Sequence, residues 1–139
     1  MTVKEYLSQY LTMVKTIDTD SEKLCNLCDL VLKITASTCD NNINTSIHDS
    51  DKIGRIVPDI IDLTNKIKLN NQKLIAIYYD ISEIIDTVND VESRQVLIKH
   101  YIGGKTFSKI ADDLDCSERW VYKIHKKALE LLKKSNSSL

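Results

Sequence analysis

The stretch TFSKIADDLDCSERWVYKI, residues 106–124, decides the fold of the C-terminal part of this chain. Apolar residues recur in it at helical spacing, and Thr106 and Ser117 each stand where a side-chain oxygen can cap the start of a helix. Only Asp115-Cys116-Ser117 separates the two helical patterns. The stretch therefore predicts a short helix over residues 107–114, a three-residue turn and a longer helix after Ser117.

A further helix is predicted upstream, over residues 91–102, and the residues of its buried face are Val91, Val96, Leu97 and Tyr101. Asn89, followed three residues later by Glu92, fits a capping box at its start, and Gly103-Gly104 ends it. We therefore expect a helix-turn-helix module over residues 89–134, with a disordered tail over residues 135–139.

The last helix of this module has two chemically different faces. Its predicted buried face consists of Val121, Ile124, Ala128 and Leu131 or Leu132. Its outward face carries Glu118, Arg119, Tyr122, Lys123 and Lys126, with Trp120 beside them. Arginine and lysine can pair with guanine, and glutamate can accept a hydrogen bond from cytosine. The pattern predicts a helix that lies in the DNA major groove, against the alternative of a solvated basic face on an ordinary helix.

Other polar residues of the module suit contacts with the phosphate backbone. These are His125, Lys127, Lys133 and Lys134, and the hydroxyls of Thr106 and Ser117 are caps or phosphate donors. The charge distribution agrees, because residues 1–90 carry a net charge of −5 and residues 91–139 a net charge of +4.

Residues 1–88 carry heptad rows and predict a helical hairpin or coiled-coil arm with a loop at about residues 38–50. The rows of the first segment are Val3, Tyr10, Ile17, Leu24 and Val31, and Tyr6, Met13, Leu27 and Ile34. Those of the second are Ile53, Ile60, Ile67, Leu74, Ile81 and Val88, and Ile56, Leu63, Ile77 and Ile84. The two segments can pair with each other or with a second copy of the chain.

Three polar or helix-breaking residues interrupt these rows and leave alternatives open. Asp20 marks either a bend in one helix or the junction of two, and Asn70 either sets the register with a partner or marks a local opening. Pro58 either kinks the second segment or makes its helix begin near Val57.

Composition sets the class. With one Pro and three Gly in 139 residues, turns are scarce, and we expect an all-α protein. The sequence has neither a signal peptide nor a membrane-spanning segment, so we expect a cytoplasmic protein that does not bind membranes.

Several weaker motifs are set aside. Gly103-Gly104-Lys105-Thr106 resembles the end of a phosphate-binding loop, but position 99 is Lys99 and a helix precedes it. Cys25 and Cys28 have metal-like spacing, yet beside Leu24 and Leu27 they are expected to be buried thiols. We expect no catalytic residues, metal or cofactor, and no enzyme.

Residues 106–124, continued by Lys127-Ala128-Leu129, resemble the helix-turn-helix of bacterial sigma factor region four. The resemblance implies that Glu118, Arg119, Trp120, Tyr122 and Lys123 face promoter DNA. Asp115 stands where that family usually has Gly, Trp120 where it often has a small residue and Tyr122 where it often has a basic one. The sigma regions that bind polymerase core and melt promoters do not fit in this chain, so a complete sigma factor is not expected.

The whole chain is also similar to a family of small phage and prophage proteins whose C-terminal part resembles the ArpU- and RinA-type late transcriptional regulators. The residues that carry this similarity are Tyr6-Leu7, Ser50-Asp51-Lys52-Ile53 and Lys99-His100-Tyr101-Ile102. It implies a phage-type transcriptional regulator of a bacterial host cell that binds double-stranded DNA. We expect the helical arm to bind a second copy of the chain, another phage protein or host RNA polymerase. The alternative is a helical interaction protein whose module docks polymerase or another protein instead of DNA.

Overall fold

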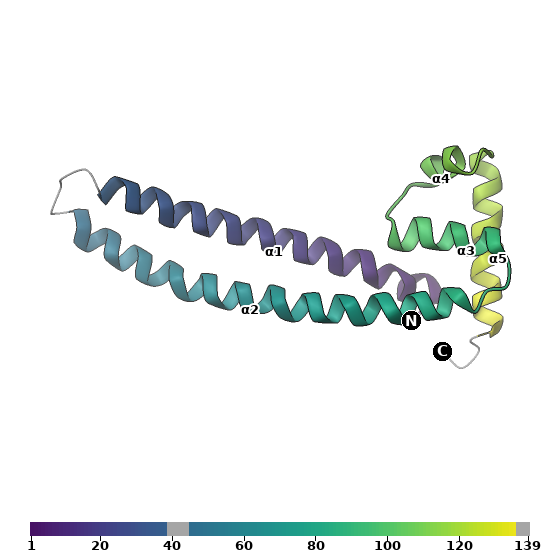
Figure 1. Ribbon diagram of the computed structural model, residues 1–139, viewed down its shortest axis with the longest axis horizontal. Coiled ribbons are helices and arrows are strands. Elements are labelled where there is room, and N and C mark those ends of the chain that lie inside the picture. The colour runs from purple at the N-terminus through teal and green to yellow at the C-terminus, as the bar shows by residue number, and fades with distance from the viewer. Residues whose placement is uncertain (39–44, 136–139) are drawn as a thin grey trace. The chain divides into compact units, whose positions relative to one another are not determined.

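The computed structural model describes the backbone of residues 1–38 and 45–135 and the side chains of residues 1–36 and 51–135. The elements in order are α1 (Val3–Thr38), α2 (Thr45–Asp86), α3 (Val91–Leu97), the π-helical turn η1 (Ile98–Ile102), α4 (Phe107–Asp113) and α5 (Glu118–Ser135) (Figure 1). No strand occurs in the part of the chain that is described, and the predicted all-α class is confirmed.

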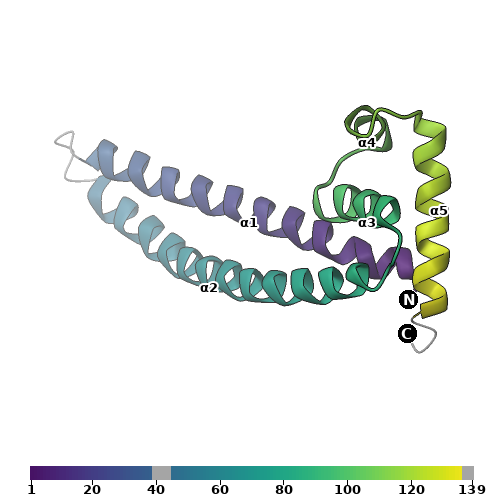
Figure 2. The same ribbon diagram turned by 45° about the vertical axis from the view of Figure 1, so that its right-hand side comes forward.

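Helices α1 and α2 run side by side in opposite directions, as Figures 1 and 2 both show. Helix α1 continues without interruption through Asp20, so the alternative of two helices is wrong. Helix α2 continues through Pro58, so a start near Val57 is wrong as well. A proline inside a helix removes one hydrogen bond, whereas each further helical residue adds one to an existing helix.

The predicted loop over residues 38–50 needs a correction. Helix α2 begins at Thr45, so residues 45–50 are helical, and residues 39–44 lie outside the described part. The preference of these side chains for turns is weak, and the hydrogen bonds gained by extending a long helix outweigh it.

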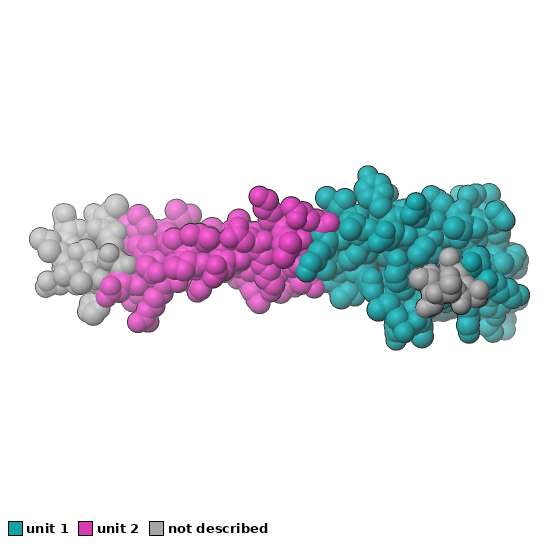
Figure 3. Space-filling view, turned by 90° about the horizontal axis from the view of Figure 1, so that it is seen from below, with its two compact units in different colours: residues 1–14, 73–139 teal, residues 15–72 magenta. Residues whose placement is uncertain are grey.

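The chain divides into two compact units, shown in Figure 3. Unit 1 consists of residues 1–14 with residues 73–139, and unit 2 of residues 15–72. Unit 1 thus contains the first turns of α1 and the last turns of α2 as well as the C-terminal helices. The predicted domain boundary near residue 89 stays a prediction.

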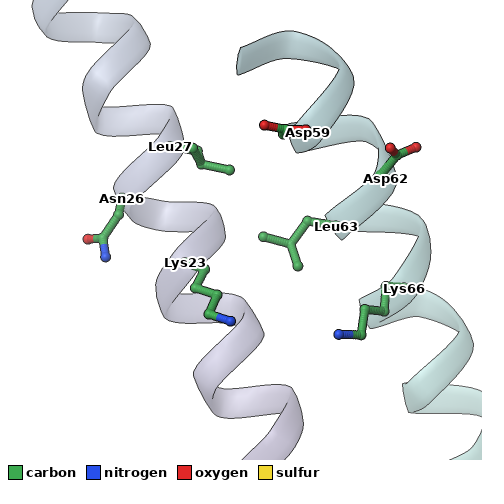
Figure 4. A pocket seen from close by; sticks show the side chains of 7 residues that line it. All are labelled: Lys23, Asn26, Leu27, Asp59, Asp62, Leu63 and Lys66. Carbon is green, nitrogen blue, oxygen red and sulfur yellow. The ribbon is translucent and has the colours of Figure 1, made fainter. Parts of the chain in front are cut away.

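In unit 2, the seam between α1 and α2 contains a polar layer. Leu27 and Leu63 point toward one another across the seam, with Lys23 and Lys66 beside them in an open groove of about 490 Å³ (Figure 4). One heptad from this leucine pair, toward the start of α1 and the end of α2, the opposing positions are Asp20 and Asn70. The two polar interruptions of the heptad rows therefore fall in the same layer.

Both residues of this polar layer are buried, with Asp20 only 3% exposed and Asn70 9%. The Nζ atom of Lys66 lies 3.6 Å from Oδ2 of Asp20, which is an ion-pair distance. No hydrogen bond reaches this oxygen from the described residues. A buried carboxylate with so little compensation costs stability, because its desolvation is incompletely offset.

Replacing Asp20 with leucine is therefore expected to stabilise the protein, by about 1–2 kcal/mol. The substitution would extend the apolar row, and Lys66 is exposed enough to remain in solvent. Urea unfolding followed by circular dichroism measures the change. Asp18→Leu is the matched control because Asp18 lies on the same helix and is exposed. A D20L variant less stable than the D18L control would contradict this account of the polar layer.

The two cysteines of metal-like spacing are exposed, so the prediction that they are buried is wrong. Cys25 and Cys28 each follow a seam leucine by one residue, and one residue turns an α-helix by about 100°. Both are free thiols, and no cluster of three potential metal ligands occurs among the described side chains.

In unit 1, the ends of the two long helices share a core with the C-terminal helices. This core consists of Leu7, Ile81, Ile85, Val88, Leu97, Tyr101, Ala128 and Leu132. Helix α5 thus packs against the first turns of α1, the last turns of α2, and α3 and η1. Within the described residues, no helix has an apolar stretch sufficient to cross a bilayer.

Candidate nucleic-acid interface

The turn between α4 and α5 is closed by backbone and side-chain hydrogen bonds. The Cys116 amide donates to the Ala111 carbonyl (3.0 Å) and the Asp115 amide to the Asp112 carbonyl (3.4 Å), the pattern of a Schellman motif. Asp115 has a φ of 51°, the left-handed conformation that this motif requires and that glycine adopts most easily. The turn that the sequence predicts at Asp115 is present. Asp115 adopts the left-handed backbone conformation at the position where the sigma region four sequences that this stretch resembles usually have glycine.

Both predicted helix caps of this turn region are present. The Thr106 hydroxyl accepts from the Lys109 amide (3.3 Å), and the Ser117 hydroxyl accepts from the Trp120 amide (3.2 Å). Upstream, the predicted capping box of Asn89 and Glu92 is wrong. The cap position of α3 is Asp90, whose carboxylate accepts from the hydroxyl of the fully buried Ser93 (2.7 Å).

A second apolar cluster holds the two helices of the motif together. Val96 of α3, Ile110 and Ala111 of α4, and Val121 and Ile124 of α5 form it. Val91, predicted to belong to this buried face, is 57% exposed instead. It lies five residues before Val96, which turns it away from that face, and the buried side chain of the first turn of α3 is Ser93.

The buried and exposed faces of α5 separate as the sequence predicts. The buried residues are Val121, Ile124, His125, Ala128 and Leu132. The exposed residues among those predicted for the site are Glu118, Arg119, Trp120, Tyr122, Lys123, Lys126 and Lys127, together with the caps Thr106 and Ser117. One face of a single helix thus presents four cations and two aromatic rings to solvent.

The two aromatic residues of this face differ in their surroundings. Tyr122 packs its ring against Phe107, with the ring centroids 4.5 Å apart, so only its outer side is free. Trp120 is 48% exposed, and no described aromatic ring lies against it. Tyr122 is 53% exposed, so both rings present about half of their surface for stacking on a ligand.

Of the four cations, one has an acidic partner within the described residues. The Nζ atom of Lys127 lies 3.4 Å from Oδ2 of Asp90. The hydrogen bond from Ser93 lowers the pKa of Asp90, and Lys127 adds to this effect, so the carboxylate stays charged at neutral pH. Arg119, Lys123 and Lys126 form no ion pair with a described carboxylate, which leaves them available to a phosphate or a base.

His125 is not a phosphate contact, and that prediction is wrong. It is 8% exposed, and its Nε2 atom lies 2.7 Å from the hydroxyl of Tyr101. Burial, aided by the nearby His100, lowers the pKa of His125 to about 4, and burial raises that of Tyr101 to about 12. His125 lies four residues after Val121 and therefore on the buried face of α5. This spacing predicts burial, although histidine is a polar residue type.

His100 joins η1 to the start of α4. Its ring stacks on Phe107, with centroids 4.4 Å apart, and its Nδ1 atom lies 2.9 Å from the carbonyl oxygen of Lys105. Lys105 donates to Asp113 (2.6 Å), and this bond lowers the pKa of Asp113. These contacts fix α4 against η1, and with it the turn that positions α5.

Comparison with known proteins agrees with this geometry. Residues 90–134 match the family model described as Sigma-70, region 4. Neither the curated proteins nor the solved structures yield a match to the chain. The matched residues include α3, η1, α4 and nearly all of α5. Residues 90–134 therefore contain a helix-turn-helix of the sigma-70 region 4 type, a domain that binds DNA in transcription regulators.

Proposed function

We propose that this chain is a phage-type transcriptional regulator that binds specific double-stranded DNA with the exposed face of α5. The observation that carries the proposal is the separation of the two faces of this helix. Val121, Ile124 and Ala128 hold it in the core, while Arg119 and Lys123 extend into solvent one turn apart near its start. The start of the second helix is the part that enters the major groove in helix-turn-helix proteins.

Within this proposal, the residues of the face have different roles. Arg119 and Lys123 read base edges, and Glu118 at the start of α5 accepts from cytosine. Lys126 and Lys127 lie farther along the helix and bind phosphates. On binding DNA, Lys127 leaves its ion pair with Asp90 and pairs with a phosphate oxygen instead. Trp120 and Tyr122 stack on sugars or bases at the edge of the contact.

The phage assignment rests on the resemblance of the sequence to small phage and prophage proteins whose C-terminal part resembles late transcriptional regulators. Host RNA polymerase is the further partner we propose, because sigma region 4 domains in general bind polymerase as well as DNA. We also propose a homodimer through the helical hairpin, since two modules on one dimer would read two half-sites.

The test compares base-reading and phosphate-binding variants on two kinds of DNA. Duplexes selected from a random pool by the wild-type protein supply the specific site. Arg119→Ala or Lys123→Ala should weaken binding to this site by about 1–3 kcal/mol and to random duplex much less, because base contacts contribute mainly to specific binding. Titrations monitored by fluorescence anisotropy over a series of salt concentrations measure both quantities.

Lys127→Ala is the control in the same helix. It should weaken binding to both DNAs alike and reduce the salt slope by about one unit, as the loss of one phosphate contact does. If the arginine and lysine variants all behave like Lys127→Ala, α5 is a basic surface without base readout. If no variant changes binding, the module docks a protein and the DNA proposal fails.

A further inference from the structure

A hollow opens in unit 1 where three elements meet, namely the first turns of α1, the end of α2 and the second half of α5. Its volume is about 780 Å³. Its apolar walls are formed by Met1, Val3, Tyr6, Ile84, Leu129 and Leu132. This size and lining are those of sites for small molecules, which are mostly apolar with a few polar groups at fixed places.

The charged residues around the hollow favour an anion. Lys4, Lys126 and Lys133 line it, against the single acidic residue Glu130. All three lysines are exposed, and none forms an ion pair with a described carboxylate. An apolar body and an anionic head group would each meet complementary surface in this hollow.

We propose that the hollow binds a small amphiphilic anion, with an alkyl or aryl body and a carboxylate, sulfonate or phosphate head group. The body would lie against Val3, Ile84 and Leu129 and the head group among the lysines. Walls from three elements would contact a compact ligand from several sides.

The occupant would compete with DNA for one cation. Lys126 lines the hollow and also belongs to the exposed face of α5. A head group bound to Lys126 withdraws it from phosphate, so the ligand weakens DNA binding, and DNA weakens ligand binding to the same degree. This coupling rests on the proposed DNA binding, whereas the binding site itself does not.

Dodecanoate, kept below its micellar concentration, is the probe for the site. Isothermal titration of the full chain is expected to show one bound dodecanoate, with dodecyltrimethylammonium, a cation of the same chain length, binding at least about tenfold more weakly. Lys133→Gln should weaken dodecanoate binding about three- to tenfold. Lys134→Gln is the matched control, because Lys134 is the next residue of α5 and does not line the hollow.

The outcomes separate the site from its coupling to DNA. Absence of dodecanoate binding, equal binding of the cation, or equal loss in the Lys133 and Lys134 variants would overturn the site. Binding to vesicles of phosphatidylcholine and phosphatidylglycerol without binding of free dodecanoate would also overturn it, in favour of a membrane surface.

Saturating dodecanoate should weaken binding to a random duplex about threefold or more. If dodecanoate binds but the duplex affinity is unchanged, the competition for Lys126 is wrong. If the chain binds no DNA at all, the proposed function fails while the site stands.

Discussion

Lowering the pH from 6.5 to 4 is expected to reduce the free energy of unfolding of unit 1 by on the order of 3 kcal/mol through His125 alone. In the folded chain, burial lowers the pKa of this histidine to about 4 from its ordinary value of 6.5. Between these two pH values the unfolded chain binds a proton that the folded chain does not. The stabilisation is therefore complete above pH 6.5 and is lost as the pH falls toward 4.

The groups around His125 strengthen this expectation. His100 and Lys4 are the charged or titratable neighbours that act on it, and both disfavour its protonated form. Protonation would also change the hydrogen bond with Tyr101, whose raised pKa keeps its hydroxyl protonated throughout this range. Asp90 and Asp113 have pKa values below 3.8, so their contributions are lost at lower pH and do not obscure the effect.

Urea unfolding at a series of pH values tests this, followed by the fluorescence of Trp120, which is the single tryptophan of the chain and lies in unit 1. His125→Gln can keep a hydrogen bond to Tyr101 but does not titrate, so it should abolish most of the slope between pH 4 and 6.5. His100→Gln, one helix away, should leave most of it. A slope that His125→Gln does not alter would show that His125 is not the titrating group.

Leu7→Ala is expected to destabilise unit 1 by about 2–5 kcal/mol, although Leu7 lies far from the C-terminal helices in the sequence. Leu7 is fully buried in the cluster that contains Tyr101 of η1 and Leu132 of α5. Removing most of its side chain leaves a cavity next to the helix that carries the proposed DNA contacts.

Leu32→Ala is the matched control on the same helix. Leu32 is 67% exposed, so its truncation should change the free energy of unfolding by less than about 0.5 kcal/mol. Urea unfolding of both variants is followed by Trp120 fluorescence, which reports on unit 1, and by circular dichroism, which reports on the helices of both units. If Leu7→Ala behaves like Leu32→Ala, the module is complete without the first turns of α1, and the shared core is not needed for its stability.

The sequence alone predicts the features of this fold that depend on local helix formation. The heptad rows predict the two long helices, and the caps Thr106 and Ser117 predict where α4 and α5 begin. The outward face of α5 follows from the apolar period of Val121, Ile124 and Ala128. These features depend on neighbours within a few residues, and the chain carries that information directly.

The predicted burial of a side chain was wrong where the residue type and its position on the helix indicate different environments. Histidine is a polar residue type that often carries a charge, which suggests a phosphate contact. His125, however, occupies a core position of α5, where its hydrogen bond with the Tyr101 hydroxyl offsets the cost of burying the ring. Cys25 and Cys28 are typically buried types, but each lies one residue beyond the seam. Position relative to the apolar face outweighed residue type in both cases.

The sequence by itself determined the all-α class, the helix-turn-helix and the exposed basic face of α5, because each rests on a periodic or capping pattern within one segment. Only the tertiary structure decided which distant segments complete that module. Leu7, Ile81 and Ile85 join its core, and Lys127 pairs with Asp90. Likewise, Asp20 and Asn70 each look like an isolated defect in a heptad row until the antiparallel pairing of α1 and α2 brings them into one layer. Burial and pairing depend on which surfaces meet in space, and a pattern read along a single segment contains no record of its partner.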